Sequence, residues 1–432
     1  MKSKAEKRQR TQEAGGDRGA PLEKIRQLLL GMVAGMAAAK QDLMAWVQEV
    51  GLAALEEVFE ADATVIAGPK GQHLLGRTHH RWGTTMAELP FGGRRIRIDR
   101  PRVRSKSGQE MKLPSVARFQ AEDPLPERVV NQILLGVSTR GYGASLEPAP
   151  PGVKGRGTSK SAASRHLVER MGTKMRDYFS RRLDDVRLLV VMLDGIEIAR
   201  HTVVVALGIT EDGTKEPLGL WQGSTENAAV CTSLLQDLIS RGLKVDGRIL
   251  CAIDGGKGIR KAIDDVLGDL AVVQRCQLHK RRNLKNHLPK GAQTYVDRML
   301  REAYGSTSVE TARKRLRSLL SWLESNGHED AAASLREGME ETLTVLKLDL
   351  PPMLRRSLAT TNAIENTLGT VRRVTRNVKR WRGGGMARRW TAIGLVAAKK
   401  RFRRIKGHRE LPALSAALRP KTADKKDEGR AA

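Results

Sequence analysis

Apolar residues recur along the chain with different spacings, and each spacing predicts a different element. From Pro21 to about Glu60 they are spaced as on one face of a helix. Residues 1–20 have almost no apolar content, which is typical of a disordered basic tail. Residues 84–104 alternate between apolar and basic positions on either side of Phe91-Gly92-Gly93. This alternation predicts a β-hairpin with one basic face.

From about residue 186 the pattern changes to short apolar runs. We expect five strands, at 186–199, 201–210, 216–224, 248–254 and 271–276. Helical spacing at 226–242 and 257–267 separates the later strands. Three antiparallel strands followed by strands alternating with helices predict an α/β fold, with a mixed five-stranded sheet flanked by helices.

The remaining segments read as helices or tails. Helical spacing predicts short helices at 126–136, 138–147 and 159–178, a strand-free helical stretch at 291–348, and closing helices at 361–380 and 386–404. The expected domains are a disordered basic tail (1–20), a mainly helical amino-terminal region (21–183), the first part of the sheet domain (184–290), a helical insertion (291–355), its closing helices (356–406) and a charged carboxy-terminal tail (407–432).

Composition indicates the partner. Lys and Arg number 77 against 48 Asp and Glu, for a formal charge of +29. Such an excess destabilises a compact chain by self-repulsion, so it is typical of a protein that binds a polyanion. Basic residues occur in every part of the chain, which favours a long nucleic-acid contact surface. The apolar stretch 28–39 is too short to span a bilayer, and three cysteines form no disulfide framework. We therefore expect an intracellular protein without a membrane partner.

The helix expected at 159–178 is a candidate DNA reader. Its segment begins with capping residues and presents Lys160 and Arg165 near the amino end. A recognition helix would carry such residues into the major groove. An ordinary solvated helix has the same features, but the charge of the chain and the order of the elements favour DNA binding.

Two aspartates follow the strongest apolar runs. Asp194 and Asp254 are each followed by glycine and are expected at the ends of strands buried on both faces. A carboxylate there is costly unless it is hydrogen-bonded, paired or bound to a cation. One Asp-Gly pair alone would favour a simple turn. Two of them in one sheet favour a metal site.

A third carboxylate is expected at Glu365. Two divalent ions about 3.5–4 Å apart can activate the attacking oxygen and stabilise the leaving one in phosphoryl transfer. Asn362 and Glu365 also fit a capping box, with Glu365 at the third position of a helix. The two interpretations are compatible, because a helix start could face the sheet.

At this point the sequence resembles the Mutator-like bacterial insertion-sequence transposases. The resemblance rests on four motifs: LDGIEI at Asp194, AIDGGKGIRKAI at Asp254, QRCQLHKRRNL at 274–284 and TTNAIENTLGTVRRVTR around Glu365. GVSTRGYG and SKSAASR match the family's amino-terminal helix-turn-helix region. The resemblance implies an RNase H-like catalytic domain with a helical insertion before the final glutamate.

The resemblance also implies a function and its partners. Asp194, Asp254 and Glu365 would be the catalytic triad and the ligands of two Mg²⁺ or Mn²⁺ ions. The substrate would be double-stranded DNA, both the terminal inverted repeats of the element and the target, cut and joined by a homodimer or larger assembly. A cytoplasmic, nucleoid-associated bacterial protein is expected. A nuclease or resolvase without strand transfer would share the triad, and a DNA-binding regulator with a decayed site would have lost part of it.

Cys276 and His279 match the family's Cys-x-x-His signature. The spacing alone could be half of a zinc site, but tetrahedral zinc needs two more ligands, and Cys251 and His287 have no recognisable spacing to the pair. We expect the pair to pack and hydrogen-bond beside the active site. The expected phosphate contacts are basic residues after the signature and on the last motif: Lys280, Arg281, Arg282, Arg372, Arg373 and Arg376.

Overall fold

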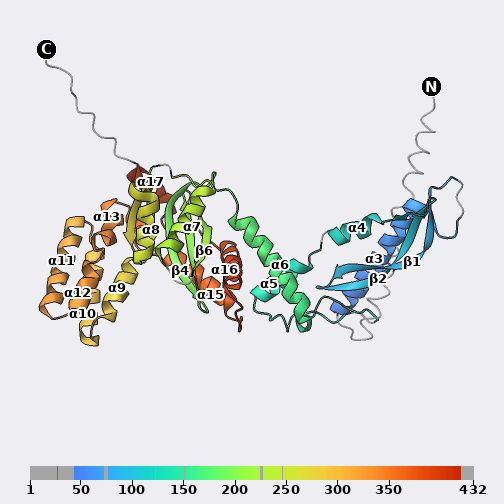
Figure 1. The fold of residues 1–432 in the computed structure, drawn as a ribbon, viewed down its shortest axis with the longest axis horizontal. Coiled ribbons are helices and arrows are strands. Elements are labelled where there is room, and N and C mark those ends of the chain that lie inside the picture. Colours follow the sequence, from blue (N-terminus) through green and yellow to red (C-terminus); the bar gives the residue numbers. More distant parts are fainter. Residues whose placement is uncertain are drawn as a thin grey trace, which may run out of the picture. The chain divides into compact units, whose positions relative to one another are not determined.

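The chain is described by a computed structural model. It covers residues 27, 43–72, 76–121, 123–149, 152–223, 227–245 and 247–419. The chain divides into two compact units, Met1–Arg170 and Met171–Ala432, and helix α6 (Lys160–Phe179) crosses the boundary (Figure 1). The expected tail at 1–20 and the residues from Pro420 onward lie outside the described residues.

The first unit is built on the predicted hairpin. Strands β1 (His79–Phe91) and β2 (Arg94–Ser105) pair antiparallel, with Phe91 opposite Arg94. Gly92 and Gly93 form the two-residue turn, and both have positive φ, 55° and 86°, as that turn type requires. A short third strand, β3 (Glu110–Met111), adds to β2. The hairpin prediction is confirmed.

One face of the hairpin packs on helix α3 (Leu43–Ala67). Phe59 of the helix is buried against Leu89 and Ile98 of the strands. The helix continues past its expected end at Glu60, because Ala63 and Ala67 also lie in this core. The part of the expected helix before residue 43 lies outside the described residues, except for residue 27.

The segment after the hairpin differs from its prediction. Helices α4 (Pro114–Ala121) and α5 (Leu125–Leu134) form, but the helix expected at 138–147 does not. That stretch contains only a 3₁₀ turn, η1 (Gly143–Ser145). Gly136 has φ 112°, and fully buried Tyr142 donates a hydrogen bond to the Gly93 carbonyl at 2.7 Å. This anchor to the hairpin turn replaces a helical conformation, so α5 and α6 lack the short connection of a helix-turn-helix.

The second unit contains the predicted mixed sheet. Its order is β6-β5-β4-β7-β8. The strands are β4 (Leu188–Ile198), β5 (His201–Thr210), β6 (Lys215–Gly223), β7 (Ile249–Ile253) and β8 (Ala271–Arg275). β4, β5 and β6 pair antiparallel, whereas β4, β7 and β8 run parallel. The expectation of an α/β fold with a mixed five-stranded sheet is confirmed.

Helices cover both faces of this sheet (Figure 1). Val191 and Leu193 of β4 lie in the core with α7 (Ala228–Ser240) and α8 (Lys257–Leu267). Alternate residues of β4 lie in the opposite core with α14 (Pro352–Leu358), α15 (Asn362–Thr375), α16 (Gly384–Lys399) and α17 (Leu411–Leu418). The tail expected from residue 407 is therefore wrong up to residue 418. Helix α17 and the turn before it, η4 (His408–Glu410), are folded, because Leu411, Leu414 and Leu418 are buried in this core.

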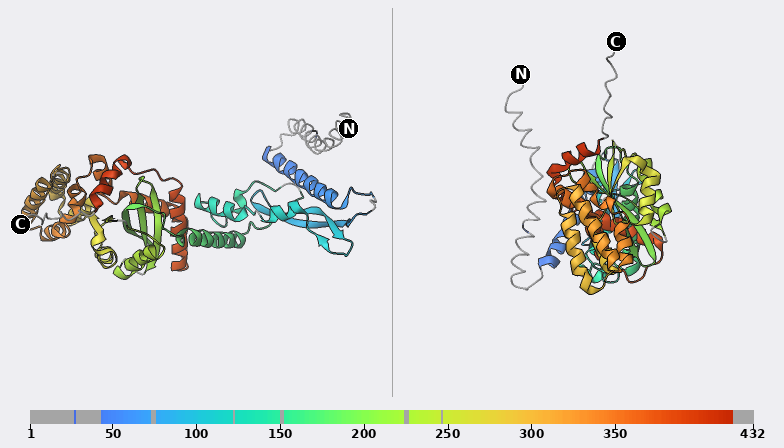
Figure 2. Two further views of the ribbon diagram at one scale, coloured as in Figure 1. Left: turned by 90° about the horizontal axis from the view of Figure 1, so that it is seen from above. Right: turned by 90° about the vertical axis from the view of Figure 1, so that its left-hand side faces the viewer.

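Among the described residues, only helices lie between β8 and α15. They are α9 (Gln277–Asn286), α10 (Lys290–Tyr304), α11 (Val309–Ser325), α12 (Glu329–Arg336), η3 (Glu340–Leu343), α13 (Thr344–Lys347) and α14. Most of them share a separate apolar core. The group, yellow to orange in Figures 1 and 2, packs beside the edge strand β8 through η3 and α13.

Candidate active site

Three parallel strands bring Asp194, Asp254 and Cys276 to one level of the sheet. Leu193 lies opposite Ile253, and Ile253 lies opposite Arg275. The residues that follow these three are therefore neighbours across β4, β7 and β8. Asp254 comes after the end of β7, as expected. The prediction that Asp194 ends its strand is wrong, because β4 continues to Ile198 through its antiparallel pairing with β5.

Asp194 and Asp254 therefore differ in backbone position and in hydrogen bonding. Asp254 starts a turn, and its Oδ1 accepts a hydrogen bond from the Gly256 amide at 3.0 Å. Asp194 lies within a continuous strand and accepts from the Gly195 amide at 2.8 Å. The simple-turn interpretation therefore fits Asp254 but not Asp194.

The Asp194 carboxyl lies in an electrostatically unfavourable place. Burial, followed by the nearby charge of Asp254, raises the pKa of Asp194 to about 6. Glu365 raises it further, whereas the Gly195 amide and His279 lower it. The ionised form of a half-buried carboxyl beside two other carboxyls is stabilised when a cation binds.

Glu365 lies far from these aspartates in the sequence, but its charge also acts on Asp194. Helix α15 packs against β4 and buries Ile364 and Leu368 in the sheet core. The Glu365 Oε1 accepts a hydrogen bond from the Thr361 hydroxyl at 2.9 Å. The expected capping box is wrong. Asn362 is the first helical residue and Thr361 the cap, with no side-chain cap hydrogen bond, so Glu365 is at the fourth position.

Cys276 and His279 are joined to Glu365 through Thr361. The Thr361 amide donates to the Cys276 Sγ at 3.3 Å, and its hydroxyl lies 3.3 Å from the His279 Nδ1. The His279 Nδ1 lies 3.8 Å from the Glu365 Oε1. Thr361 is fully buried, and sequence reasoning missed its role. The only signal was its place directly before the Asn362-to-Glu365 motif.

The same contacts shift the pKa values of both Cys276 and His279. The hydrogen bond to Cys276 raises the pKa of His279 to about 9, against the effect of burial. Burial opposes ionisation of Cys276, but hydrogen bonds from His279 and Thr361 outweigh it and lower the pKa of the thiol. His279 is thus positioned as a cation beside the carboxylates.

The donor atoms of Cys276, His279 and Glu365 lie within 4.8 Å of one another. Neither Cys251 nor His287, the partners considered from the sequence, belongs to this group. Cys251 lies in the core between the sheet and α8, and His287 caps the far end of α9. A metal at Cys276 and His279 would therefore take Glu365 as its third ligand.

The basic residues after the signature have different environments. Lys280 was expected at the surface but is buried, and its Nζ donates to the Ser334 and Glu337 carbonyls at 2.6 and 2.7 Å. Burial lowers the pKa of Lys280 to about 8. The expectation that it contacts phosphate is wrong, because it binds the end of α12.

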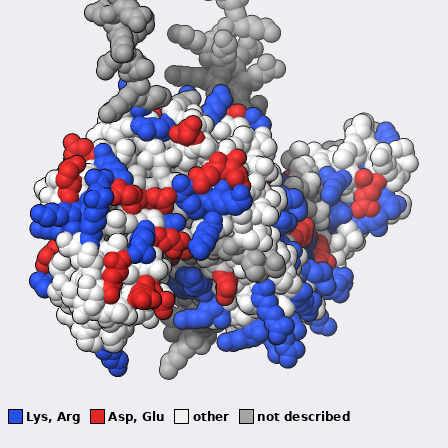
Figure 3. All heavy atoms as spheres, turned by 60° about the vertical axis from the view of Figure 1, so that its left-hand side comes forward, with Lys and Arg blue, Asp and Glu red and all other residues white. Residues whose placement is uncertain are grey.

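The other expected DNA contacts are distributed over both units. Arg281 is paired with Asp297 at 2.8 Å, whereas Arg282 is 55% exposed and lies 3.5 Å from the Glu365 Oε2. The remaining expected contacts are all exposed: Arg372 and Arg373 on α15, Arg376 at its carboxy-terminal cap, and Lys160 and Arg165 on α6. On the face drawn in Figure 3, Lys and Arg side chains gather in places with few acidic neighbours.

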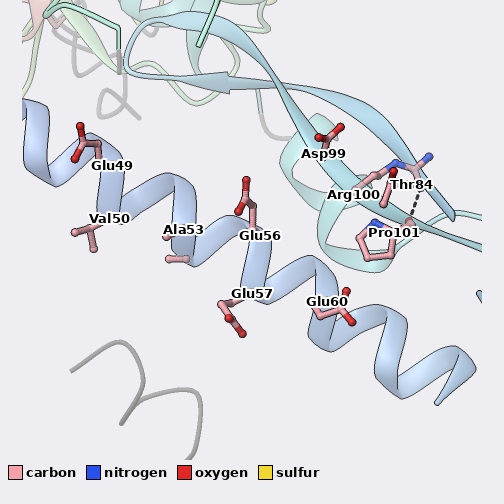
Figure 4. A pocket seen from close by; sticks show the side chains of 11 residues that line it. Glu49, Val50, Ala53, Glu56, Glu57, Glu60, Thr84, Asp99, Arg100 and Pro101 are labelled. Carbon is pink, nitrogen blue, oxygen red and sulfur yellow. Dashed lines mark hydrogen bonds between the residues drawn. The ribbon is translucent and has the colours of Figure 1, made fainter. Parts of the chain in front are cut away.

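The first unit also has an acidic groove of about 580 Å³ between α3 and the hairpin. Figure 4 shows glutamates spaced along α3, with Asp99, Arg100 and Pro101 coming from β2. Glu49, Glu56 and Glu60 give this surface a charge opposite to that of the chain. It would repel a phosphate backbone, so we do not place DNA there.

The comparisons with known proteins identify a family. Residues 25–400 match the family described as "Transposase, Mutator family". The fold and site therefore belong to a chain of the transposase class. The chain is a member of the Mutator family of transposases.

Several relatives are transposases of bacterial insertion sequences. The chain is 32% identical over 183 residues to the transposase of IST2 from Acidithiobacillus ferrooxidans, covering 42% of this chain and 60% of the relative. It is 27% identical to the transposase of IS6120 from Mycolicibacterium smegmatis, covering 62% and 83% of the two chains. For the transposase of IS905 from Lactococcus lactis the identity is 24%, covering 78% and 85%. A match to a probable insertion-sequence transposase from Corynebacterium diphtheriae spans 54% of that protein. The relatives from Acidithiobacillus ferrooxidans and Corynebacterium diphtheriae are thus matched over only 60% and 54% of their length. Among the described residues, none of the helices has the length and apolar character needed to cross a membrane.

Proposed function

We propose that this chain is the transposase of an insertion sequence, with Asp194, Asp254 and Glu365 as its catalytic carboxylates. The observation that carries the proposal is that Asp254, after the end of β7, and Glu365, near the start of α15, both act electrostatically on Asp194 of β4. Burial and the charge of Asp254 raise the pKa of Asp194 to about 6, and strongly perturbed carboxyls of this kind are common at functional sites.

The donor set fits divalent metal. All three residues offer carboxylate oxygens, which are the ligands that Mg²⁺ and Mn²⁺ prefer. Asp194 and Asp254 would hold metal, and Glu365 would complete the shell of a second ion. When bound, such ions would polarise the phosphate and lower the pKa of an attacking water or hydroxyl.

The chain's own residues would then align the strand for two reactions. In the first, water attacks the phosphate at the element end, the new P–O bond forms, and the P–O3′ bond breaks to free a 3′-hydroxyl. In the second, that hydroxyl attacks a phosphate of the target DNA in line, so that a new P–O bond joins the two DNAs while the P–O3′ bond of the target breaks and leaves a 3′-hydroxyl on the target strand. Arg282 and protonated His279 lie beside Glu365 and would balance its charge while the strand is in place. Cutting two ends in concert requires at least a homodimer on DNA.

The finer fold assignment belongs to the same proposal. The sheet order and the helices α9–α14 before Glu365 fit an RNase H-like catalytic domain, 184–290 and 356–406, interrupted by an all-helical insertion at 291–355. Helix α17 would extend that domain to residue 418. Residues 21–183 would bind the element ends, with Lys160 and Arg165 on α6. A chain with this function would work in the bacterial cytoplasm, at the nucleoid.

The competing function is a nuclease or resolvase that cuts without joining. The test uses the full-length chain, Mg²⁺, a target plasmid and paired duplexes that carry the inverted repeats flanking this gene. A transposase joins the cleaved 3′ ends to the plasmid. Cleavage without any joined product would support the nuclease instead. Binding without cleavage, at every divalent metal tried, would indicate a decayed enzyme that acts as a regulator.

A further inference from the structure

A cavity of about 360 Å³ lies in the second unit, next to the motif that carries Glu365. It is formed where α9 begins, where α10 ends and where the chain approaches α15. Its polar lining comes from Gln277, Arg281, Arg301, Tyr304, Thr360 and Asn362. Asn362 precedes Glu365 by three residues on one helix, so the two lie on neighbouring positions of its surface.

The cavity carries unbalanced positive charge. Asp297 is 5% exposed and is surrounded by three cations. Arg281 donates to its Oδ1 through Nε at 3.0 Å and Nη2 at 2.8 Å. Arg301 reaches the Oδ2 at 2.5 Å, and Lys285 lies 3.7 Å from the Oδ1. One buried carboxylate cannot neutralise three cations, and an anion that joins them relieves their mutual repulsion.

Asp297 also fixes where the cations lie. It holds Arg281 in the wall of the cavity, while the Arg301 side chain stays 67% exposed. Arginine offers five N–H donors, so a guanidinium that binds one carboxylate edge keeps donors for a second anion. The pair is therefore arranged for a second oxyanion.

The amino ends of two helices add to the positive electrostatic potential of the cavity. Gln277 is the first residue of α9 and Asn362 the first residue of α15, and both line the cavity. The amino ends of helices carry partial positive charge and attract phosphate. Together with two arginines, these ends favour a tetrahedral oxyanion over any cation or apolar ligand.

We infer that this cavity binds one backbone phosphate of the DNA strand that enters the carboxylate site. The inference rests on the proposed function, since it takes DNA as the ligand. The contact holds the strand beside Glu365 without taking part in the chemistry. Arg301, Arg281 and the start of α15 are thus positioning groups for the strand.

The first test measures the salt dependence of DNA binding. Full-length protein is titrated with a short duplex of arbitrary sequence in the presence of chelator, so no cleavage occurs. Losing one phosphate contact should lower the slope of log K against log salt by about 0.9. We expect this change for Arg301→Ala. The matched control is Arg298→Ala, an arginine of similar exposure on the same helix that pairs with Glu302 at 3.5 Å.

A second pair of variants adds negative charge without removing a contact to Asp297. Asn362→Asp places a carboxylate at the start of α15, where it stabilises the helix but repels a phosphate in the cavity. Ser308→Asp adds the same charge at the cap of α11, which lies outside the cavity. We expect Asn362→Asp to weaken duplex binding about tenfold or more at low salt, because it opposes a contact of one phosphate. Ser308→Asp should have a much smaller effect.

Two results would overturn the inference: equal slopes for Arg301→Ala and Arg298→Ala, or equal weakening by Asn362→Asp and Ser308→Asp. Inorganic phosphate, added at constant ionic strength, distinguishes the free ion from the strand. Stronger competition against wild type than against Arg301→Ala supports the site, whereas equal competition argues against it. Cleavage by the wild type with Mg²⁺ is assayed separately. Its failure would remove the proposed function and leave the binding result intact.

Discussion

Charged side chains have different partners at the hairpin of the first unit and at the carboxylate site of the second. Several hairpin arginines have acidic partners. Arg81 lies 2.7 Å from Glu60, and Arg102 lies 2.6 Å from Glu110. In the second unit, burial and then the charges of Asp254 and Glu365 raise the pKa of the Asp194 carboxyl. Exposed ion pairs contribute little to stability, whereas converging like charges are costly. The neighbouring carboxylates of the second unit therefore indicate a ligand, whereas the ion pairs of the hairpin do not.

The same contrast holds for the cations. Arg281, Lys285 and Arg301 share the single carboxylate of Asp297. In the first unit Arg95 pairs with Asp123 at 2.5 Å, and Glu110 has two arginine partners, Arg100 and Arg102. We expect local charge imbalance, more than total charge, to distinguish the surfaces that bind DNA from those that are only solvated.

The largest effect is expected at the carboxylates. Asp194→Asn, Asp254→Asn and Glu365→Gln should each lower the cleavage rate by about 10³-fold or more, because residues that act as one unit fail singly. DNA binding should persist, and chelator should abolish wild-type cleavage. Asp265→Asn, a 47%-exposed position on α8, is the matched control. A variant that cleaves element-end DNA at a near-normal rate would lose its place in the triad.

The next effect concerns recognition by the first unit. The double variant Lys160→Ala, Arg165→Ala should weaken binding of element-end DNA by about tenfold or more and reduce its preference over random DNA, if these side chains contact bases. Arg176→Ala, an exposed arginine further along α6, controls for loss of charge. Binding is compared by titration with both duplexes. An equal loss on both would make Lys160 and Arg165 phosphate contacts instead of sequence readers.

A smaller effect is expected on folding. Asp297→Asn leaves three cations around a neutral side chain, and we expect a loss of about 2 kcal/mol in the free energy of unfolding. Burial raises the pKa of Asp297, but the hydrogen bonding of Arg281 and the charges of Arg281, Lys285 and Arg301 together outweigh burial and lower the pKa. The stabilisation is thus complete above the ordinary aspartate pKa of about 4 and is lost as pH falls through the lower folded-state value.

Denaturant unfolding at neutral and acid pH measures this effect. The gap between wild type and Asp297→Asn should narrow at the lower pH. A gap that does not change with pH would mean that packing, not charge, accounts for the role of Asp297.

The smallest effect is expected at Cys276. Cys276→Ser keeps an acceptor for the Thr361 amide but buries a more polar group, so stability should fall by about 1 kcal/mol, with a moderate loss of strand transfer. Elemental analysis of purified wild type should find no stoichiometric zinc. About one zinc per chain, lost in Cys276→Ser and in Glu365→Gln, would instead make Cys276, His279 and Glu365 a metal site.

The sequence by itself determined the elements whose signals are local. The turn at Gly92-Gly93 required two positive φ angles, and the apolar runs before Asp194 and Asp254 predicted adjacent buried strands. Helix α8 begins and ends at the expected residues, Lys257 and Leu267. Motif order then sufficed to name the three carboxylates as candidates, although only tertiary structure could bring them together.

Tertiary structure decided the features that depend on distant partners. Tyr142 contacts Gly93 across the sequence, and this contact replaced the helix expected at 138–147. Thr361 lies 85 positions from Cys276, so no sequence pattern near either residue could predict their contact. Lys280 was expected to contact phosphate, yet it binds the carbonyls at the end of α12. A local pattern specifies backbone conformation and an apolar face, but which polar groups meet depends on how those faces pack.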